Sequence, residues 1–246
     1  MFLILSFFVH KQWERLYSSD KDGRSFNRLD WSLLGYTGAT VTVIKTTQDA
    51  VIGAYTAVPW KESSHFYGGA ESYLFQLEPQ LAVYRPQGLE HNFAYLHTSH
   101  KSTLMPGLDR DLPCGLGFGG TLDNPRLFIP ESFDHCNAGF LDKTYSPGNL
   151  LPLSALEKFE ISCVEIWGVG SNETIKKAMH DQAEYRERNE MYTQEARMVH
   201  DKKDFLKDFE TGLIPNDLYN HKRDSRGRHE FIVDEKHKGA YKIERE

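Results

Sequence analysis

The chain has little cysteine, with only Cys114, Cys136 and Cys163 in 246 residues. Their number is odd and no two of them have the C-x-x-C spacing, so the sequence indicates neither a disulfide framework nor a zinc knuckle. This usage fits a reducing compartment. The chain also has no loop of the EF-hand pattern, so calcium regulation of that kind is not indicated within it.

Positive charge is not in excess either, because the net charge is −6 at pH 7. A surface that binds nucleic acid needs a basic face to displace counterions, so we expect no nucleic-acid partner. Long apolar runs are missing as well. The most apolar stretch, residues 1–9, is far shorter than the ~20 residues of a transmembrane helix. It also lacks the basic start and the cleavage site of a signal peptide.

The glycines do not complete a cofactor motif. Gly115, Gly117 and Gly120 match the G-x-G-x-x-G spacing of a dinucleotide site, but an Asn-Pro pair follows where that motif opens a helix. Residues 68–71 (GGAE) lack the Lys-Ser or Lys-Thr pair of a phosphate loop. We therefore expect no cofactor and attribute these glycines to turns and close backbone packing.

Metal ligands and catalytic constellations are equally sparse. His97 and His100 stand three apart, but no third ligand is near in sequence, and Asp109 and Asp111 supplement them only weakly. Residues 134–136 (DHC) have the composition of a catalytic triad, yet neighbours in sequence point their side chains in divergent directions. We expect no metal site and no triad.

Two residues remain to be weighed for oxidation chemistry. Glu71 enters an apolar strand, where a carboxylate needs hydrogen-bond partners or a chemical role. We favour a structural role and keep Glu71 as the one weak catalytic candidate. Cys163 lies in a central strand, residues 159–167, whose two faces both carry apolar residues. We expect it to be a buried small side chain rather than a reactive thiol.

Short β-prone segments make up most of the first 170 residues, and the stretch 51–77 is central to them. Its first strand ends where Pro59 cannot donate to a ladder, and its second alternates from Ser72 onward. The predicted strands cover residues 13–17, 40–46, 50–58, 72–77, 81–84, 93–96, 114–122, 126–129 and 159–167.

The connections between these strands are predicted from turn residues and periodicity. Hairpins are expected to join 40–46 to 50–58 and 81–84 to 93–96, and residues 130–151 are expected to form a long loop. Apolar residues at helical spacing predict a short helix over residues 25–34, with Ser25 as N-cap.

The rest of the chain has a different composition. Residues 171–246 hold 16 of the 29 Lys and Arg and 17 of the 35 Asp and Glu. A span without Gly or Pro predicts a helix from Ser171 or Asn172 to about residue 210. Apolar residues recur every seven at Ala178, Tyr185, Tyr192, Val199 and Leu206, with polar Gln182, Asn189 and Lys203 between them.

This narrow stripe favours docking on a surface or a partner over a stable coiled coil, and a helix lying along its own domain is the alternative. We divide the chain into a lead-in (1–12), a domain (13–170), a long charged helix (171–210) and a flexible polar tail (211–246).

Several motifs occur in an order typical of one family. They are LYSSDKDGRSF at 16–26, VIK at 43–45, IGAY at 52–55, PWK at 59–61, FYGGAESYLF at 66–75, LGFGG at 116–120 and FEISCVEIWG at 159–168. By these motifs, residues 13–168 resemble the TLDc domain of the eukaryotic oxidation-resistance proteins. The family-motif positions are Trp13, Tyr17, Asp22, Gly23, Gly53, Pro59, Trp60, Phe66, Tyr67, Gly68, Glu71, Ser72, Phe75, Gly117, Gly119, Gly120, Glu165 and Trp167.

The resemblance implies an α+β fold of two mainly antiparallel β-sheets packed as a sandwich, with flanking short helices, and the many short strands support it. The long C-terminal helix is added to this domain. The resemblance also implies a non-catalytic regulatory domain that binds the vacuolar proton-pumping ATPase and contributes to oxidative-stress resistance. No settled catalytic residues accompany the family.

These implications lead to an expected location and leave two other functions open. A cytoplasmic protein is expected, associated peripherally with a membrane complex through its protein partner, and a mitochondrial location stays open. The alternative functions are an oxidation-protective enzyme or scavenger and a structural subunit of a larger assembly.

Overall fold

A computed structural model describes residues 12–99, 112–152, 158–210, 222–223 and 229–230, with side chains of the C-terminal helix described through 195 and at 198. The chain forms two units, Met1–Arg188 and Asn189–Glu246. The first contains two antiparallel sheets, the short helix α2 (Phe26–Leu33) and the first turns of the long helix α4 (Asn172–Glu210).

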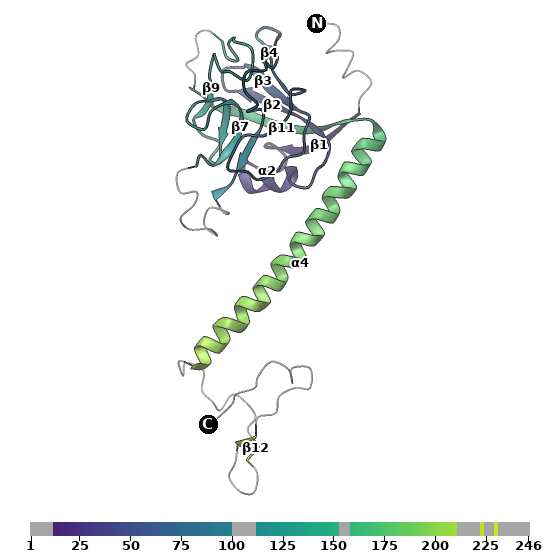
Figure 1. The fold of residues 1–246 in the computed structure, drawn as a ribbon, viewed down its shortest axis with the longest axis vertical. Coiled ribbons are helices and arrows are strands. Elements are labelled where there is room, and N and C mark those ends of the chain that lie inside the picture. The colour runs from purple at the N-terminus through teal and green to yellow at the C-terminus, as the bar shows by residue number, and fades with distance from the viewer. Residues whose placement is uncertain (1–11, 100–111, 153–157, 211–221, 224–228, 231–246) are drawn as a thin grey trace. The chain divides into compact units, whose positions relative to one another are not determined.

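The larger sheet has six strands, and every neighbouring pair in it is antiparallel. Its last strand in sequence lies between the first two, so both ends of the domain meet at one side of the sheet (Figure 1). In spatial order the strands are β1 (Gln12–Ser18), β11 (Ile161–Gly170), β2 (Ala39–Thr46), β3 (Val51–Thr56), β4 (Tyr73–Glu78) and β5 (Ala82–Tyr84).

The smaller sheet has five strands, again all antiparallel. In spatial order they are β10 (Lys158–Phe159), β9 (Cys136–Ala138), β8 (Pro125–Pro130), β7 (Gly115–Gly120) and β6 (Tyr95–His97). The two sheets with the flanking α2 form the α+β sandwich that the sequence predicts, and that fold class is confirmed.

One cluster of buried side chains joins the two sheets and α2. Ile52 and Ile166 enter it from the larger sheet, Leu116 and Ile129 from the smaller, and Leu29 from α2. All five are fully buried. Strand alternation turns every second side chain of a strand to the same face, and Leu29 belongs to the buried face of α2. Burying an aliphatic side chain of this size contributes about 1.5–3 kcal/mol, so this cluster dominates the stability of the domain.

The other face of the larger sheet carries a second, smaller apolar cluster around Val41, Tyr55 and Phe75. The rings of Tyr55 and Tyr73 stack across β3 and β4 with centroids 5.0 Å apart. Gly53 has no room for a side chain here, because a Cβ would come within 2.5 Å of the Phe75 ring. This close approach explains the glycine of the IGAY motif.

The pairing of strands confirms one predicted hairpin and contradicts the other. β2 and β3 form the hairpin expected for residues 40–46 and 50–58. The hairpin of 81–84 with 93–96 is wrong, because β5 pairs with β4 and β6 pairs with β7 in the other sheet. Residues 85–92 carry the chain from one sheet to the other. The turn residues in this segment indicate that the chain changes direction, but they do not indicate which strand β6 pairs with.

Three smaller expectations need correction. The predicted loop 130–151 contains β9, whose three residues are too few to give a periodic signal. Ser25 stands at the N-cap of α2, but its side chain makes no capping hydrogen bond. Cys163 is only half-buried, because one row of β11 side chains lies on the partly exposed face of the larger sheet.

The long C-terminal helix is confirmed as α4. Its N-cap is Ser171, whose hydroxyl accepts a hydrogen bond from the Thr174 N–H at 3.2 Å. Within the stretch predicted as a polar tail, β12 (Lys222–Arg223) and β13 (His229–Glu230) form a two-residue antiparallel ladder.

Candidate functional site

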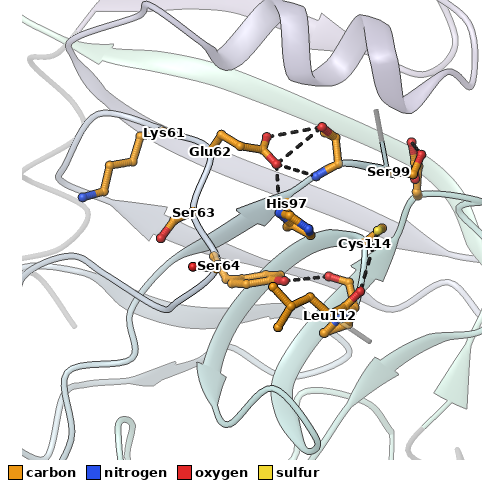
Figure 2. A network of polar contacts seen from close by, with 12 residues as sticks. Lys61, Glu62, Ser63, Ser64, His97, Ser99, Leu112 and Cys114 are labelled. Atoms are coloured by element: carbon orange, nitrogen blue, oxygen red, sulfur yellow. Dashed lines mark hydrogen bonds and ion pairs between the residues drawn. The ribbon is translucent and has the colours of Figure 1, made fainter. Parts of the chain in front are cut away.

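A glutamate and a histidine meet in a buried position at the end of β6 (Figure 2). Nδ1 of His97 lies 3.0 Å from Oε1 of Glu62, and their side chains are 4% and 12% exposed. The same carboxylate oxygen accepts the Thr98 N–H at 2.7 Å. One residue further on, the Ser63 N–H donates to the Leu96 carbonyl at 2.9 Å. These bonds fasten the β3–β4 connection to the end of β6.

The burial of His97 limits what this pair can do chemically. Among the described residues neither ring nitrogen makes a well-directed hydrogen bond, so the Nδ1 contact with Glu62 has the distance of an ion pair without the direction of a hydrogen bond. A general acid or base must reach the proton that it transfers. A ring that is 4% exposed offers a substrate no approach, and the geometry therefore favours a structural role.

Cys114 lies beside this network, where Figure 2 shows its sulfur near Leu112. The thiol donates to the Leu112 carbonyl at 3.7 Å. Burial raises the pKa of Cys114, and the carboxylates of Glu131 and Glu62 raise it further. The thiol is therefore protonated at neutral pH and is a poor nucleophile.

The pKa values of the other two thiols, Cys136 and Cys163, are also raised. Burial raises the pKa of Cys136 to about 12, with Glu160 and Asp134 adding to the effect. Burial is also the largest cause that raises the pKa of the half-buried Cys163. A redox-active cysteine has a lowered pKa and an electropositive surrounding. The structure gives all three cysteines the opposite environment.

Glu71 lies in the turn before β4 and is exposed, so it does not enter the apolar strand as the sequence suggests. No hydrogen bond or ion pair joins it to the other described residues. After burial, its charge is the second cause that raises the pKa of Tyr55. The DHC stretch diverges as expected, because Cys136 is buried while His135 is 82% exposed and pairs with Glu160 at 3.3 Å.

A buried ion pair that the sequence reasoning missed organises the loop after β9. The side chains of Arg126 and Asp142 are 0% and 2% exposed, and Nη1 lies 3.4 Å from Oδ1. Oδ2 of Asp142 accepts the N–H groups of Gly120, Thr144 and Tyr145 at 3.1, 2.9 and 3.1 Å. No local motif predicts this ion pair, because Arg126 and Asp142 are 16 residues apart and belong to a strand and a loop.

Arg126 and Asp142 also explain the glycine segment LGFGG. Gly119 has φ +69°, and a Cβ on it would lie 2.9 Å from Oδ2 of Asp142 and 2.8 Å from the Tyr145 ring. A side chain there would be strained and would displace the carboxylate. The requirement for glycine is thus structural.

Several other family-motif residues fix turns and layers. The Trp60 indole, 3% exposed, donates to the Thr40 hydroxyl at 2.8 Å and meets the Phe118 ring edge-on at 5.7 Å, so it links the two sheets. Tyr17 donates its hydroxyl to the Gly23 carbonyl at 2.8 Å. In the same turn, Asp22 accepts the Ser18 N–H at 2.8 Å.

Five of the remaining motif residues, Glu165, Trp167, Trp13, Tyr67 and Phe66, also make local contacts. Glu165 accepts the Trp167 indole N–H at 3.1 Å, and the Trp167 ring meets Trp13 at 6.4 Å. The Tyr67 hydroxyl bonds both the N–H and the carbonyl of Lys61. Phe66 packs on the ring of Tyr95, Pro59 and Gly68 lie in the β3–β4 connection, Ser72 precedes β4, and Gly117 lies in β7.

The first turns of α4 are joined to α2 by polar contacts. Gln182, 2% exposed, donates its side-chain amide to the Ser32 carbonyl at 2.7 Å and the Leu34 carbonyl at 3.4 Å. Arg186 donates to the Trp31 carbonyl at 3.1 Å, with its guanidinium 5.7 Å from the Trp31 ring centre. The last carbonyls of a helix have no partner within it, so α4 satisfies those of α2.

The apolar stripe predicted for the long helix is buried only where α4 contacts the domain, and it is exposed further along the helix. Ala178 is buried, and Tyr185 packs against the core. Further on, Met191, Tyr192 and Met198 are 55%, 67% and 64% exposed. Val199 and Leu206 lie outside the side chains that are described.

A hollow of about 390 Å³ opens where β11 ends and where β2 and α4 begin. Tyr36, Ser171 and Lys177 are among its lining residues. The Tyr36 hydroxyl has no hydrogen-bond partner among the described residues. Its pKa is raised to about 12, mainly by burial and to a smaller extent by the negative charge of Glu14. The residues that line the hollow therefore supply hydroxyls and one lysine but no carboxylate, imidazole or thiol.

Across the described ranges, no three His, Cys, Asp or Glu side chains gather closely enough to hold a metal ion. His100, Asp109 and Asp111, the weak ligand candidates, lie outside those ranges. None of the described helices is both long and apolar enough to cross a membrane.

Comparison with known proteins identifies the family. The TLDc domain model matches residues 1–170. "MTOR-associated protein MEAK7" of Xenopus laevis is 32% identical over 168 residues, covering 68% of this chain and 34% of that protein. The Gallus gallus protein of the same name is 32% identical over 164 residues, covering 66% and 32%.

"Oxidation resistance protein 1" of Xenopus tropicalis is 29% identical over 155 residues, covering 63% of this chain and 16% of that protein. The chain thus spans about a third of the length of the MEAK7 relatives that it matches. Because the family model covers more than half of its residues, the chain belongs to the TLDc domain family.

Proposed function

We propose that the chain is a non-catalytic regulatory domain that binds the vacuolar proton-pumping ATPase on its cytosolic side and contributes to oxidative-stress resistance. Membership of the TLDc family supports a regulatory role. The observation that carries the proposal is the construction of α4. Gln182 and Arg186 fix its first turns to α2, whereas Met191, Tyr192 and Met198 further along are exposed and available to a partner.

Binding to the pump is tested by sedimentation. The purified chain is mixed with the detached peripheral sector of the vacuolar ATPase and with the intact pump in detergent, and each mixture is spun through a gradient. We expect the chain to travel with at least one of them. A chain that stays at the top of both gradients would refute the proposed partner. The relatives named for association with mTOR make an mTOR-containing complex the second candidate for the same assay.

The competing function is an oxidation-protective enzyme that uses Glu71 or a thiol. The raised pKa values of Cys114, Cys136 and Cys163 count against it, because the protonated thiol reacts poorly with peroxide. Peroxide turnover is measured for the wild-type chain and for Glu71→Gln. We expect no turnover above buffer in either; turnover that Glu71→Gln abolishes would favour the enzyme.

A structural subunit of a larger assembly is the third function, with α4 as its attachment. Removing residues 189–246 cuts the chain at the boundary between its two units. If α4 makes the contact with the partner, this truncated chain should keep the thermal stability of the domain and should no longer sediment with the partner. Undiminished binding would assign the contact to the domain alone.

A further inference from the structure

Three large apolar side chains stand exposed at the tips of two neighbouring loops. Leu89, in the loop between β5 and β6, is 68% exposed. Phe140 and Leu141, in the loop that follows β9, are 51% and 63% exposed. Single exposed apolar residues are ordinary, but a group of large ones marks an interaction surface. These three residues are called the loop-tip patch.

The two loops are bound to each other, so the three residues of the loop-tip patch are held on adjoining segments. The Gln87 N–H donates to the Thr144 carbonyl at 2.9 Å, next to a bridge between Pro86 and Tyr145. Beside the patch itself, Nζ of Lys143 lies 3.4 Å from Oε1 of Glu90 and joins the loops by an ion pair. Leu89 precedes Glu90 directly, and Leu141 lies two residues before Lys143.

The second loop also rests on a rigid base. Asp142, directly after Leu141, is the buried carboxylate that accepts three backbone N–H groups. The Gly148 N–H donates to the Phe140 carbonyl at 3.0 Å and closes the loop. Side chains held in place before binding lose less conformational entropy on association. The loop-tip patch is thus prepared for contact at low entropic cost.

We propose that the loop-tip patch is a second contact, in addition to the exposed residues of α4, by which the domain docks into an apolar pocket of its protein partner. The inference rests on the proposed function, which supplies the probe. The charges beside the patch favour a protein over a bilayer, because Lys143 and Glu90 neutralise each other, whereas binding to an anionic lipid surface requires net positive charge. Apolar anchors at the centre with paired charges at the rim are the pattern of protein interfaces.

The test compares three forms of the full chain in sedimentation with the peripheral sector of the vacuolar ATPase and with the intact pump. They are the wild type, the triple variant L89S/F140S/L141S, and the control L77S/L81S. Leu77 and Leu81 are 46% and 48% exposed and lie at the opposite end of β5. We expect the control to bind like the wild type and the triple variant to bind at least about tenfold more weakly, since a central interface anchor typically costs more than a factor of ten.

Each outcome separates the inference from the proposed function. If the wild type binds and the triple variant binds equally well, the inference fails and the proposed function stands. If the wild type binds neither the peripheral sector nor the intact pump, both fail. Thermal denaturation checks that the triple variant folds, which we expect because the replaced side chains are exposed. If the triple variant melts at a lower temperature than the wild type, the binding comparison is repeated with the single variants Leu89→Ser and Phe140→Ser, one on each loop.

Vesicles test the lipid alternative. The wild type is spun with vesicles of phosphatidylcholine and phosphatidylserine, and we expect it to stay in the supernatant. Pelleting of the wild type but not of the triple variant would make the patch a membrane contact and overturn the assignment to a protein pocket.

Discussion

Replacing Asp142 by asparagine should destabilise the domain more than any exposed charge substitution. Asparagine keeps the shape of the side chain but removes its charge and one of its acceptor oxygens. Arg126, whose side chain is fully buried, would keep its positive charge, and the carbonyls of Gly148 and Ser146 at 2.5 and 3.5 Å would be its remaining acceptors among the described residues. The amide would also turn a donor toward either Arg126 or the three N–H groups that Asp142 now accepts.

The expected loss follows from these two effects. Breaking a buried ion pair by removing one partner costs about 3–5 kcal/mol, because an uncompensated charge stays buried. Each unmade backbone hydrogen bond in a buried site adds about 1 kcal/mol. The total loss is therefore at least roughly 3–5 kcal/mol, a large share of the 5–15 kcal/mol by which domains are typically stable.

The assay is equilibrium unfolding in urea, followed by tryptophan fluorescence. Asp49→Asn is the matched control, because Asp49 belongs to an exposed ion pair with Lys45 and has φ 60°, which asparagine tolerates. We expect the control to stay within about 0.5 kcal/mol of the wild type. A loss below about 1 kcal/mol for Asp142→Asn would refute the reasoning, since it would mean that Arg126 does not depend on this carboxylate.

Three further experiments probe buried side chains. Because burial raises the pKa of Cys136 to about 12, iodoacetamide near neutral pH should label it far more slowly in the native chain than in denaturant, and rapid native labelling seen by mass spectrometry would contradict this. Burial likewise raises the pKa of Tyr36 to about 12 and that of Tyr145 further, whereas an unfolded tyrosine ionises near about pH 10. The folded pKa is the higher one, so the contribution to stability is complete below about pH 10 and is lost as the pH rises through the folded value. Ultraviolet difference absorbance and circular dichroism should then change together; ionisation of all 12 tyrosines near pH 10 with the fold intact would count against it. Finally, Gln182→Ala leaves the carbonyls of Ser32 and Leu34 without their donor and should cost about 1–3 kcal/mol in urea unfolding, whereas the exposed Gln194→Ala should cost nothing; equal stabilities would refute the role of Gln182.

Local patterns were sufficient to predict most strands. Alternation identified β4 and most of β11, but Phe159, counted in the same predicted strand as β11, lies in β10 of the smaller sheet. The strand predicted before Pro59 is β3, which ends at Thr56, two residues earlier than predicted. The Asp-Gly turn after β1 is built as its residue types suggest, with Asp22 bonding the Ser18 N–H and Gly23 at φ +84°. In each case the signal lies within a few residues of the structure that it predicts.

Sheet membership and buried polar pairs could not be predicted, because they depend on residues far apart in the chain. Nothing in residues 81–96 says that β5 and β6 belong to different sheets. Gln182 reads as a polar break in the apolar stripe of the helix, yet it is buried because it bonds carbonyls about 150 residues earlier. Arg126 and Asp142 likewise have no signal apart from the fold that joins them.

The polar side chains that complete α2 lie beyond residue 170, the last position matched by the family. An expression boundary placed at that position would leave the final turn of α2 open to water and prone to fraying. A fragment intended for crystallisation or for fusion to another protein should therefore extend at least to Arg188, since the segment needed for a complete domain is longer than the residues that the family model matches.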